Sequence, residues 1–238
     1  MAQHALPHQV DSVDDLLCAT TYVVQPSTQA LSNAGLSWQQ QQELNIVFLV
    51  TREMLVSLRA YMDALQTAGF AEGNIGLDID GKAKLVRNNW LLLTYGSRRV
   101  REDMRENRWV QTFSPFGVLL APSEAYIHHL YAVLALKEAC KRVLKRDLNI
   151  LAQNTDAHKS TVNLARMLPI PISTLCYPHI ARAPVDRKNR KYLRGKQKER
   201  DNFTLNVISP DLRAVQQCKT VKQVQSHTMA THTHQRPP

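Results

Sequence analysis

Residues 37–69 read SWQQQQELNIVFLVTREMLVSLRAYMDALQTAG, and this stretch holds the strongest periodic pattern in the chain. Ser37 can accept a hydrogen bond from the first turn of a helix while Gln40 reaches back to its amide, which is a capping-box arrangement. Gly69 suits the left-handed position that commonly ends a helix. The sequence therefore predicts one long amphipathic helix over residues 37–69.

A heptad seam runs along this predicted helix, with its members at alternating spacings of four and three. They are Leu44, Phe48, Thr51, Leu55, Leu58, Met62 and Leu65. Such a seam can pair with its copy in a second chain or pack within its own fold, and the periodicity fits both. A homodimer formed through Leu44 to Leu65 is one of these two expectations.

A second long amphipathic helix is predicted from Ser123, its N-cap, to about Gln153, because its apolar residues gather on one face. On and beside the opposite face we expect Lys141, Arg142, Lys145 and Arg146. A shorter helix over residues 156–168 should follow and end at Pro169.

Two segments between the long predicted helices carry weaker patterns. Residues 70–82 alternate apolar and polar positions among glycines, which predicts a short strand or hairpin. Residues 98–108 hold five arginines interleaved with three acids. Opposite charges three or four residues apart pair on a helix, so this segment is interpreted as a salt-bridged surface.

The C-terminal part is predicted to leave the helical body. Four prolines between residues 169 and 184 forbid a continuous helix, so residues 170–177 are expected as an edge strand or a polyproline-like segment. Residues 203–208 alternate apolar and polar side chains, as a strand does. The simplest arrangement is an antiparallel β-ribbon that projects a basic arm.

Together these patterns predict a mainly α fold, with a helical core of two long amphipathic helices and a small antiparallel β-ribbon bearing a basic arm. A chain of 238 residues with 44% hydrophobic content is long enough to bury a core. The expected divisions are a loose leader over residues 1–36, a helical domain over 37–168, the ribbon and arm over 169–208, and a polar tail over 209–238.

Charge is distributed unevenly along the chain, whose formal net charge is +10. Residues 1–81 contain two Lys or Arg against nine Asp or Glu, which leaves −7 there and +17 over residues 82–238. This partition indicates an acidic part for packing or protein contacts and a basic part that faces an anion.

The densest cationic segment is the predicted arm. Crowded cations repel one another, and binding a phosphate backbone relieves the repulsion while releasing condensed counterions. Arginine also suits bidentate contacts with phosphate or guanine, and Tyr192 can stack on a base. The predicted nucleic-acid-binding residues are Lys141, Arg142, Lys145, Arg146, Arg182, Arg187, Lys188, Arg190, Lys191, Tyr192, Arg194, Lys196, Lys198 and Arg200.

These features favour a regulatory or architectural nucleic-acid-binding protein that binds DNA in preference to RNA. The alternative is a non-enzymatic adaptor that uses the predicted helix 37–69 as its working surface and docks an acidic partner with the basic arm. A nuclease or nickase is a third hypothesis, which the inventory of motifs argues against.

Several function classes are not expected. No P-loop, GxGxxG, GxSxG or HExxH string occurs, so we expect neither an enzyme nor a bound cofactor. His128 and His129 diverge by about 100° on a helix and are interpreted as core or surface residues, with no metal site. Short apolar runs and widely spaced cysteines favour a soluble, cytoplasmic protein with no membrane partner.

Overall fold

The computed structural model describes residues 3–7, 12–82, 90–103, 108–155 and 159–175, and apart from Leu175 these belong to one unit, Met1–Thr174. Within it, the stretch predicted as one helix forms three elements, α2 (Trp38–Glu43), β3 (Val47–Thr51) and α3 (Arg52–Thr67). The predicted caps are confirmed: Ser37 and Gln40 form a capping box, and Gly69 follows α3 with a φ of 89°.

A strand interrupts the predicted helix because residues 46–50, IVFLV, are an unbroken apolar run rich in β-branched and aromatic side chains. Such a run suits a strand, and on β3 the fully buried Phe48 and Val50 alternate with partly exposed residues. Thr51 then begins α3 as its N-cap, since its Oγ1 accepts a hydrogen bond from the Met54 amide at 3.3 Å. The prediction of a continuous helix over residues 37–69 is therefore wrong.

The heptad seam is part of the core of its own chain. Leu55 and Leu58 on α3 are fully buried, and Met62 is 2% exposed. Phe48 joins the same core from β3. These four side chains therefore pack within their own chain, and the homodimer through Leu44 to Leu65 stays a prediction.

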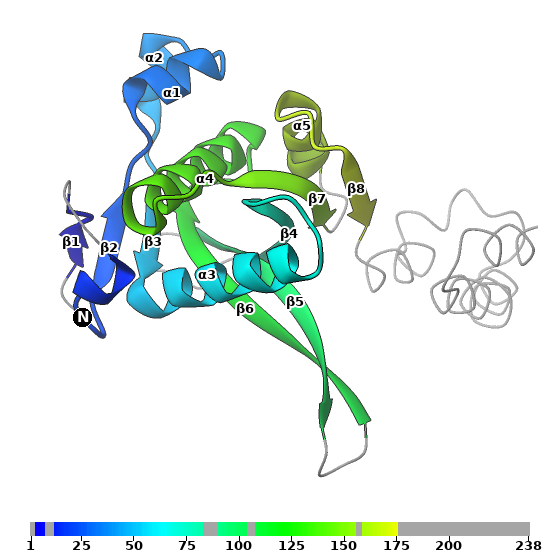
Figure 1. Cartoon of the computed structure of the whole chain (residues 1–238). Coiled ribbons are helices and arrows are strands. Elements are labelled where there is room, and N and C mark those ends of the chain that lie inside the picture. Colours follow the sequence, from blue (N-terminus) through cyan, green and yellow to red (C-terminus); the bar gives the residue numbers. More distant parts are fainter. Residues whose placement is uncertain (1–2, 8–11, 83–89, 104–107, 156–158, 176–238) are drawn as a thin grey trace, which may run out of the picture. The chain divides into compact units, whose positions relative to one another are not determined.

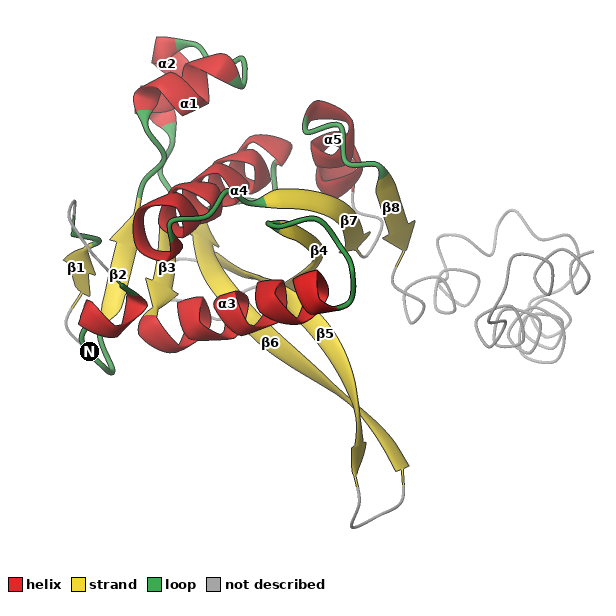
Figure 2. Cartoon of the chain, viewed as in Figure 1, coloured by secondary structure: helices red, strands yellow, loops and turns green. Residues whose placement is uncertain are grey.

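The described residues form one mixed sheet of eight strands, so the prediction of a mainly α protein is wrong (Figures 1 and 2). Across the sheet the order is β1 (Gln3–Ala5), β2 (Thr21–Val24), β3, β6 (Arg108–Ala121), β5 (Leu91–Asp103), β4 (Asn74–Lys82), β7 (Asn149–Thr155) and β8 (Ile172–Leu175). β1 runs parallel to β2, and β4 runs parallel to β7. From β2 to β4 in this order, all neighbours are antiparallel. The strand predicted within residues 70–82 is confirmed as β4.

The predicted second long helix is also divided. α4 (Tyr126–Ala139) continues into a π-helical turn, Cys140–Leu144, and the chain then enters β7. α4 is not amphipathic: buried residues lie all around it, which is typical of a helix covered on several sides. α5 (Lys159–Met167) confirms the shorter predicted helix, and it packs against α4.

α3 and α4 both pack against the sheet, and their buried side chains belong to one core (Figure 1). Phe116 on β6 packs against Tyr61 of α3, with ring centroids 5.6 Å apart. Tyr95, the cross-strand partner of Gly117, has its ring 6.0 Å from that of His129 on α4.

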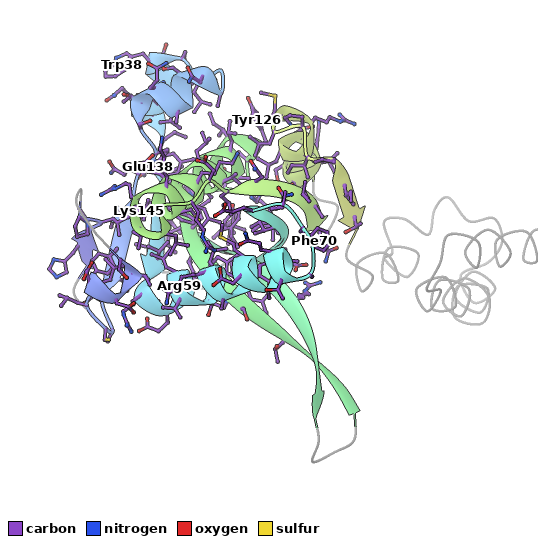
Figure 3. All side chains as sticks on the ribbon, in the orientation of Figure 1. Trp38, Arg59, Phe70, Tyr126, Glu138 and Lys145 are labelled. Carbon is purple, nitrogen blue, oxygen red and sulfur yellow. The ribbon has the colours of Figure 1, made fainter. Side chains whose placement is uncertain are left out.

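Residues 1–36, predicted as a loose leader, belong to the fold wherever the structure describes them. β1 and β2 form one end of the strand order. Buried core residues of this segment are Leu6, Val13, Leu16, Tyr22, Val24, Leu31 and Leu36. α1 (Thr28–Asn33) and α2 form a small helical pair between β2 and β3 (Figure 1), on which Trp38 is 68% exposed (Figure 3).

Among the helices of the described ranges, none is long and apolar enough to span a lipid bilayer.

Candidate nucleic-acid interface

The four cations predicted on the second helix lie in or directly after the π-helical turn. Lys141 is exposed and lines an open pocket of about 320 Å³ to which α1 and α4 also contribute residues. Lys137, Glu138 and Asp147 line the same pocket. Because charges of both signs meet there, this pocket is not a uniformly basic surface.

Arg142 and Lys145 make contacts within the chain. Arg142 donates hydrogen bonds from its guanidinium to the carbonyl oxygens of Leu6 and Pro7. Lys145 follows the turn in the left-handed region, with a φ of 55°, and its Nζ donates to the Arg142 carbonyl at 2.9 Å (Figure 3). These contacts end the helix and hold the N-terminal segment against it, a structural role that sequence patterns did not indicate.

Arg146 is paired with the acidic half of the chain. Its Nη1 lies 2.5 Å from Oδ1 of Asp63 on α3, and its Nε lies 3.5 Å from Oε1 of Glu72. Part of the N-terminal acidity is therefore used to neutralise this cation within the fold. The structure does not arrange the four predicted cations as one outward-facing row.

The other predicted binding residues lie outside the described residues. They are Arg182, Arg187, Lys188, Arg190, Lys191, Tyr192, Arg194, Lys196, Lys198 and Arg200. The predicted strand over residues 203–208 and the tail over 209–238 also fall there. β8 confirms the strand expected within residues 170–177, and it stands at the end of the strand order.

The structure contains a cationic element that the sequence interpretation missed, the hairpin of β5 and β6. β5 pairs with β4 only as far as Gly96, and β6 pairs with β3 only from Val118 onward. Beyond these points the two strands pair with each other, from Ser97 opposite Ser114 to Asp103 opposite Arg108. We call this two-stranded part, residues 97–103 and 108–114, the ribbon.

The ribbon extends beyond the rest of the sheet (Figure 2). Its β5 strand includes Arg98, Arg99 and Arg101, and its β6 strand begins at Arg108. The interpretation of residues 98–108 as a salt-bridged helical surface is therefore wrong for the residues described there. A strand does not bring charges three or four residues apart together as a helix does.

A carboxylate fixes the point where the ribbon leaves the sheet. Asp78 on β4 is 9% exposed, and its Oδ2 accepts a hydrogen bond of 2.7 Å from the Arg98 amide. Its Oδ1 accepts another of 2.7 Å from Nδ2 of Asn154 on β7 and lies 3.9 Å from Nε of Arg98. One side chain thus ties the ribbon to two neighbouring strands.

Glycine is required at the same point. The register shifts between Tyr95 and Gly96, which marks a β-bulge. A Cβ at Gly96 would lie 2.2 Å from the Ser114 carbonyl oxygen, so a side chain would force the two strands apart. Bulges of this kind bend a strand and increase its twist. The bulge and Asp78 together direct the ribbon away from the sheet.

A second polar cluster lies inside the fold, between β5, α4 and α5. His129 is fully buried; its Nδ1 lies 2.7 Å from the Tyr95 hydroxyl and its Nε2 lies 3.2 Å from Oγ of Ser160. Oε1 of Glu124 lies 3.4 Å from the same Nε2. Burial raises the pKa of Tyr95 well above its ordinary value, which keeps its hydroxyl neutral.

This cluster has the residue types of a nucleophilic site but not the arrangement. The hydroxyl of Tyr95 occupies the position on His129 where a carboxylate would orient a catalytic histidine, and Ser160 is 6% exposed. Its contacts fasten α4 and α5 to the sheet. Within the described ranges, no group of three or more His, Cys, Asp or Glu residues could hold a metal ion.

His128 gives the fold a predicted dependence on pH. Burial lowers the pKa of His128, although its Nδ1 lies 2.6 Å from the Ser123 carbonyl oxygen. A histidine whose pKa is lower in the folded state takes up protons preferentially on unfolding, so stability should fall as the pH decreases through the unfolded pKa of about 6.5. Urea denaturation at pH 7.5 and pH 5.5 should show this fall, and His128→Gln should reduce it. An undiminished fall in the variant would assign the effect to other groups.

Comparisons of the chain with protein-family models, with characterised proteins and with solved structures found no match. Neither the fold nor these comparisons test nucleic-acid binding, which stays a prediction.

Proposed function

We propose that this chain is a regulatory or architectural nucleic-acid-binding protein that binds DNA in preference to RNA through its basic half. The observation that carries the proposal is the partition of charge, −7 over residues 1–81 against +17 over residues 82–238. An excess of this size in one part of a chain attracts polyanions and gains free energy by releasing their counterions.

The contacts within the fold support a narrower assignment of the binding residues. Some described cations of the body are paired with acids of the N-terminal half, as Arg52 is with Asp14 at 2.8 Å and Arg146 is with Asp63. The uncompensated excess is greatest over residues 182–200, where nine Lys or Arg stand against two acids. We therefore assign the main phosphate contacts to this segment and not to the π-helical turn.

The shape of the ribbon supports the proposed preference for DNA. The major groove of B-form DNA is about 12 Å wide and admits a two-stranded ribbon, whereas the major groove of A-form RNA is too deep and narrow for side chains to read. A chain with such a ribbon gains contacts on duplex DNA that structured RNA does not offer. Single strands would offer phosphates but no groove.

Binding to four polyanions at one salt concentration tests this proposal. Fluorescence anisotropy would compare labelled duplex DNA, single-stranded DNA, a structured RNA hairpin and polyglutamate, each with the full chain. We expect the duplex to bind most tightly and polyglutamate most weakly. Equal affinity for polyglutamate would instead indicate an acidic protein partner, and tighter binding to the RNA hairpin would overturn the preference for DNA.

A further inference from the structure

The open pocket of about 320 Å³ is lined by segments that lie far apart in the chain. α1 contributes Ala30, and α4 contributes Leu134, Lys137 and Glu138, the last of which is labelled in Figure 3. Lys141 is added by the π-helical turn. Small-molecule sites in proteins have volumes of roughly 300–1,000 Å³, so this pocket has the size for a ligand as small as an amino acid.

The reversal of the chain after α4 completes the lining. Lys145 adopts the left-handed conformation, with a φ of 55°, and the chain that follows enters β7. Asp147, Leu148 and Asn149 from this returning segment line the pocket together with α4. Leu148 is 3% exposed and belongs to the core, and Leu134 packs against the same core. The apolar part of the lining is therefore held in place by the fold.

Four charged side chains line the pocket, two of each sign. They are Lys137, Glu138, Lys141 and Asp147. None of the ion pairs among the described residues involves any of these four. Lys137 and Glu138 are also partly buried. Burial of a charge without an opposite charge beside it costs free energy, so a ligand that supplies opposite charges recovers part of that cost.

We propose that this pocket binds a free α-amino acid with an apolar side chain. The two lysines bind its carboxylate, the two acids bind its ammonium group, and Leu134 and Leu148 contact its side chain. The charges of the lining sum to zero, and this disfavours a phosphate or a nucleotide, because the two acids would repel it. The two lysines disfavour a metal cation for the same reason. The inference goes beyond the proposed function, since neither the site nor its test involves a nucleic acid.

Ligands that differ by one charge test the pocket in the full chain. Isothermal titration calorimetry would compare L-leucine with 4-methylpentanoate, which lacks the ammonium group, and with 3-methylbutylamine, which lacks the carboxylate. Hydrogen bonds to charged groups are strong, so we expect L-leucine to bind at least about tenfold more tightly than either analogue. Equal affinity for 4-methylpentanoate, or tighter binding of inorganic phosphate, would overturn the inference in favour of an anion site. Absence of binding by both L-leucine and L-phenylalanine at millimolar concentration would overturn it outright.

Paired substitutions assign each charge of the ligand to its partners. Lys137→Met combined with Lys141→Met should weaken L-leucine binding at least about tenfold and remove the difference between L-leucine and 3-methylbutylamine. Glu138→Gln combined with Asp147→Asn should weaken it similarly and remove the difference between L-leucine and 4-methylpentanoate. Wild-type affinity for L-leucine in both pairs would contradict the inference.

The matched control combines Lys159→Met with Glu43→Gln, which replace one exposed cation and one exposed acid outside the pocket. This control should bind L-leucine as the unmodified chain does, and an equal loss of affinity in the control would show that the pocket is not the site. Circular dichroism would check that each variant is folded. The single substitutions Lys141→Met and Asp147→Asn, at exposed positions, carry the same test if a pair does not fold.

Discussion

Combining Arg187→Gln, Lys188→Gln, Arg190→Gln and Lys191→Gln is expected to lower the affinity for duplex DNA by roughly 10³-fold at 0.1 M salt. The estimate follows from counterion release, since each phosphate contact contributes about 0.9 to the slope of log K against log salt. Four lost contacts make the slope shallower by about 3.6, so the affinity gained between 1 M and 0.1 M salt falls by a factor of a few thousand. The change should be measured by anisotropy with one labelled duplex throughout.

A matched control separates local contacts from net charge. The segment beyond residue 208 also contains four cations, Arg213, Lys219, Lys222 and Arg236. Replacing these four by glutamine changes the net charge equally, but we expect a much smaller loss of affinity. Equal losses in the two variants would indicate that the overall charge, and not the segment of residues 182–200, attracts the nucleic acid.

Phe48→Ala is expected to lower the free energy of unfolding by about 3–5 kcal/mol, the usual cost of removing a buried phenyl ring. Phe48 is fully buried on β3, where its ring lies 5.9 Å from that of Tyr95 in an edge-to-face arrangement. A Cβ at Gly117 would lie 2.2 Å from Phe48 Cζ, so the ring already fills the space above that glycine. Urea denaturation monitored by circular dichroism would measure the loss.

Trp38→Ala provides the comparison for this variant. Trp38 also lies within residues 37–69 but is 68% exposed on α2 (Figure 3), so its removal should change stability by less than about 0.5 kcal/mol. A small effect of Phe48→Ala would contradict the position of β3 in the sheet.

Local signals in the sequence predicted local structure well. The capping box at Ser37, the left-handed Gly69, the strand within residues 70–82 and the shorter helix before Pro169 are all confirmed. Each depends on interactions between residues a few positions apart. Such signals need no knowledge of what packs against the segment.

The fold class could not be obtained in the same way. A run such as residues 46–50 fits both a buried strand and a buried helix, and the heptad spacing on either side favoured the helix. β3 forms a strand because it pairs with β2 and β6 in the sheet, and its partner residues on β6 lie about 70 residues away in the chain. Periodicity within one segment carries no information about such partners.

The ribbon was missed for a related reason. Residues 98–108 contain five arginines and three acids, which are compatible with ion pairs on a helix. This local explanation did not take into account the apolar runs on both sides of the segment. Apolar runs at residues 91–93 and 116–120 flank the charged segment almost symmetrically, as the two arms of a hairpin do. The internal partners of Arg142 and Arg146 had no sequence signal, because they come from residues far away in the chain.

The central claim is that the cations of residues 82–238 meet phosphates, and the salt dependence of duplex binding by the unmodified chain tests it most directly. Affinity should be measured from about 0.05 M to 0.5 M salt with one DNA duplex. We predict a linear fall of log K against log salt with a slope of about −4 or steeper, corresponding to about five or more phosphate contacts. A flat response, or no binding at the lowest salt concentration, would contradict the claim.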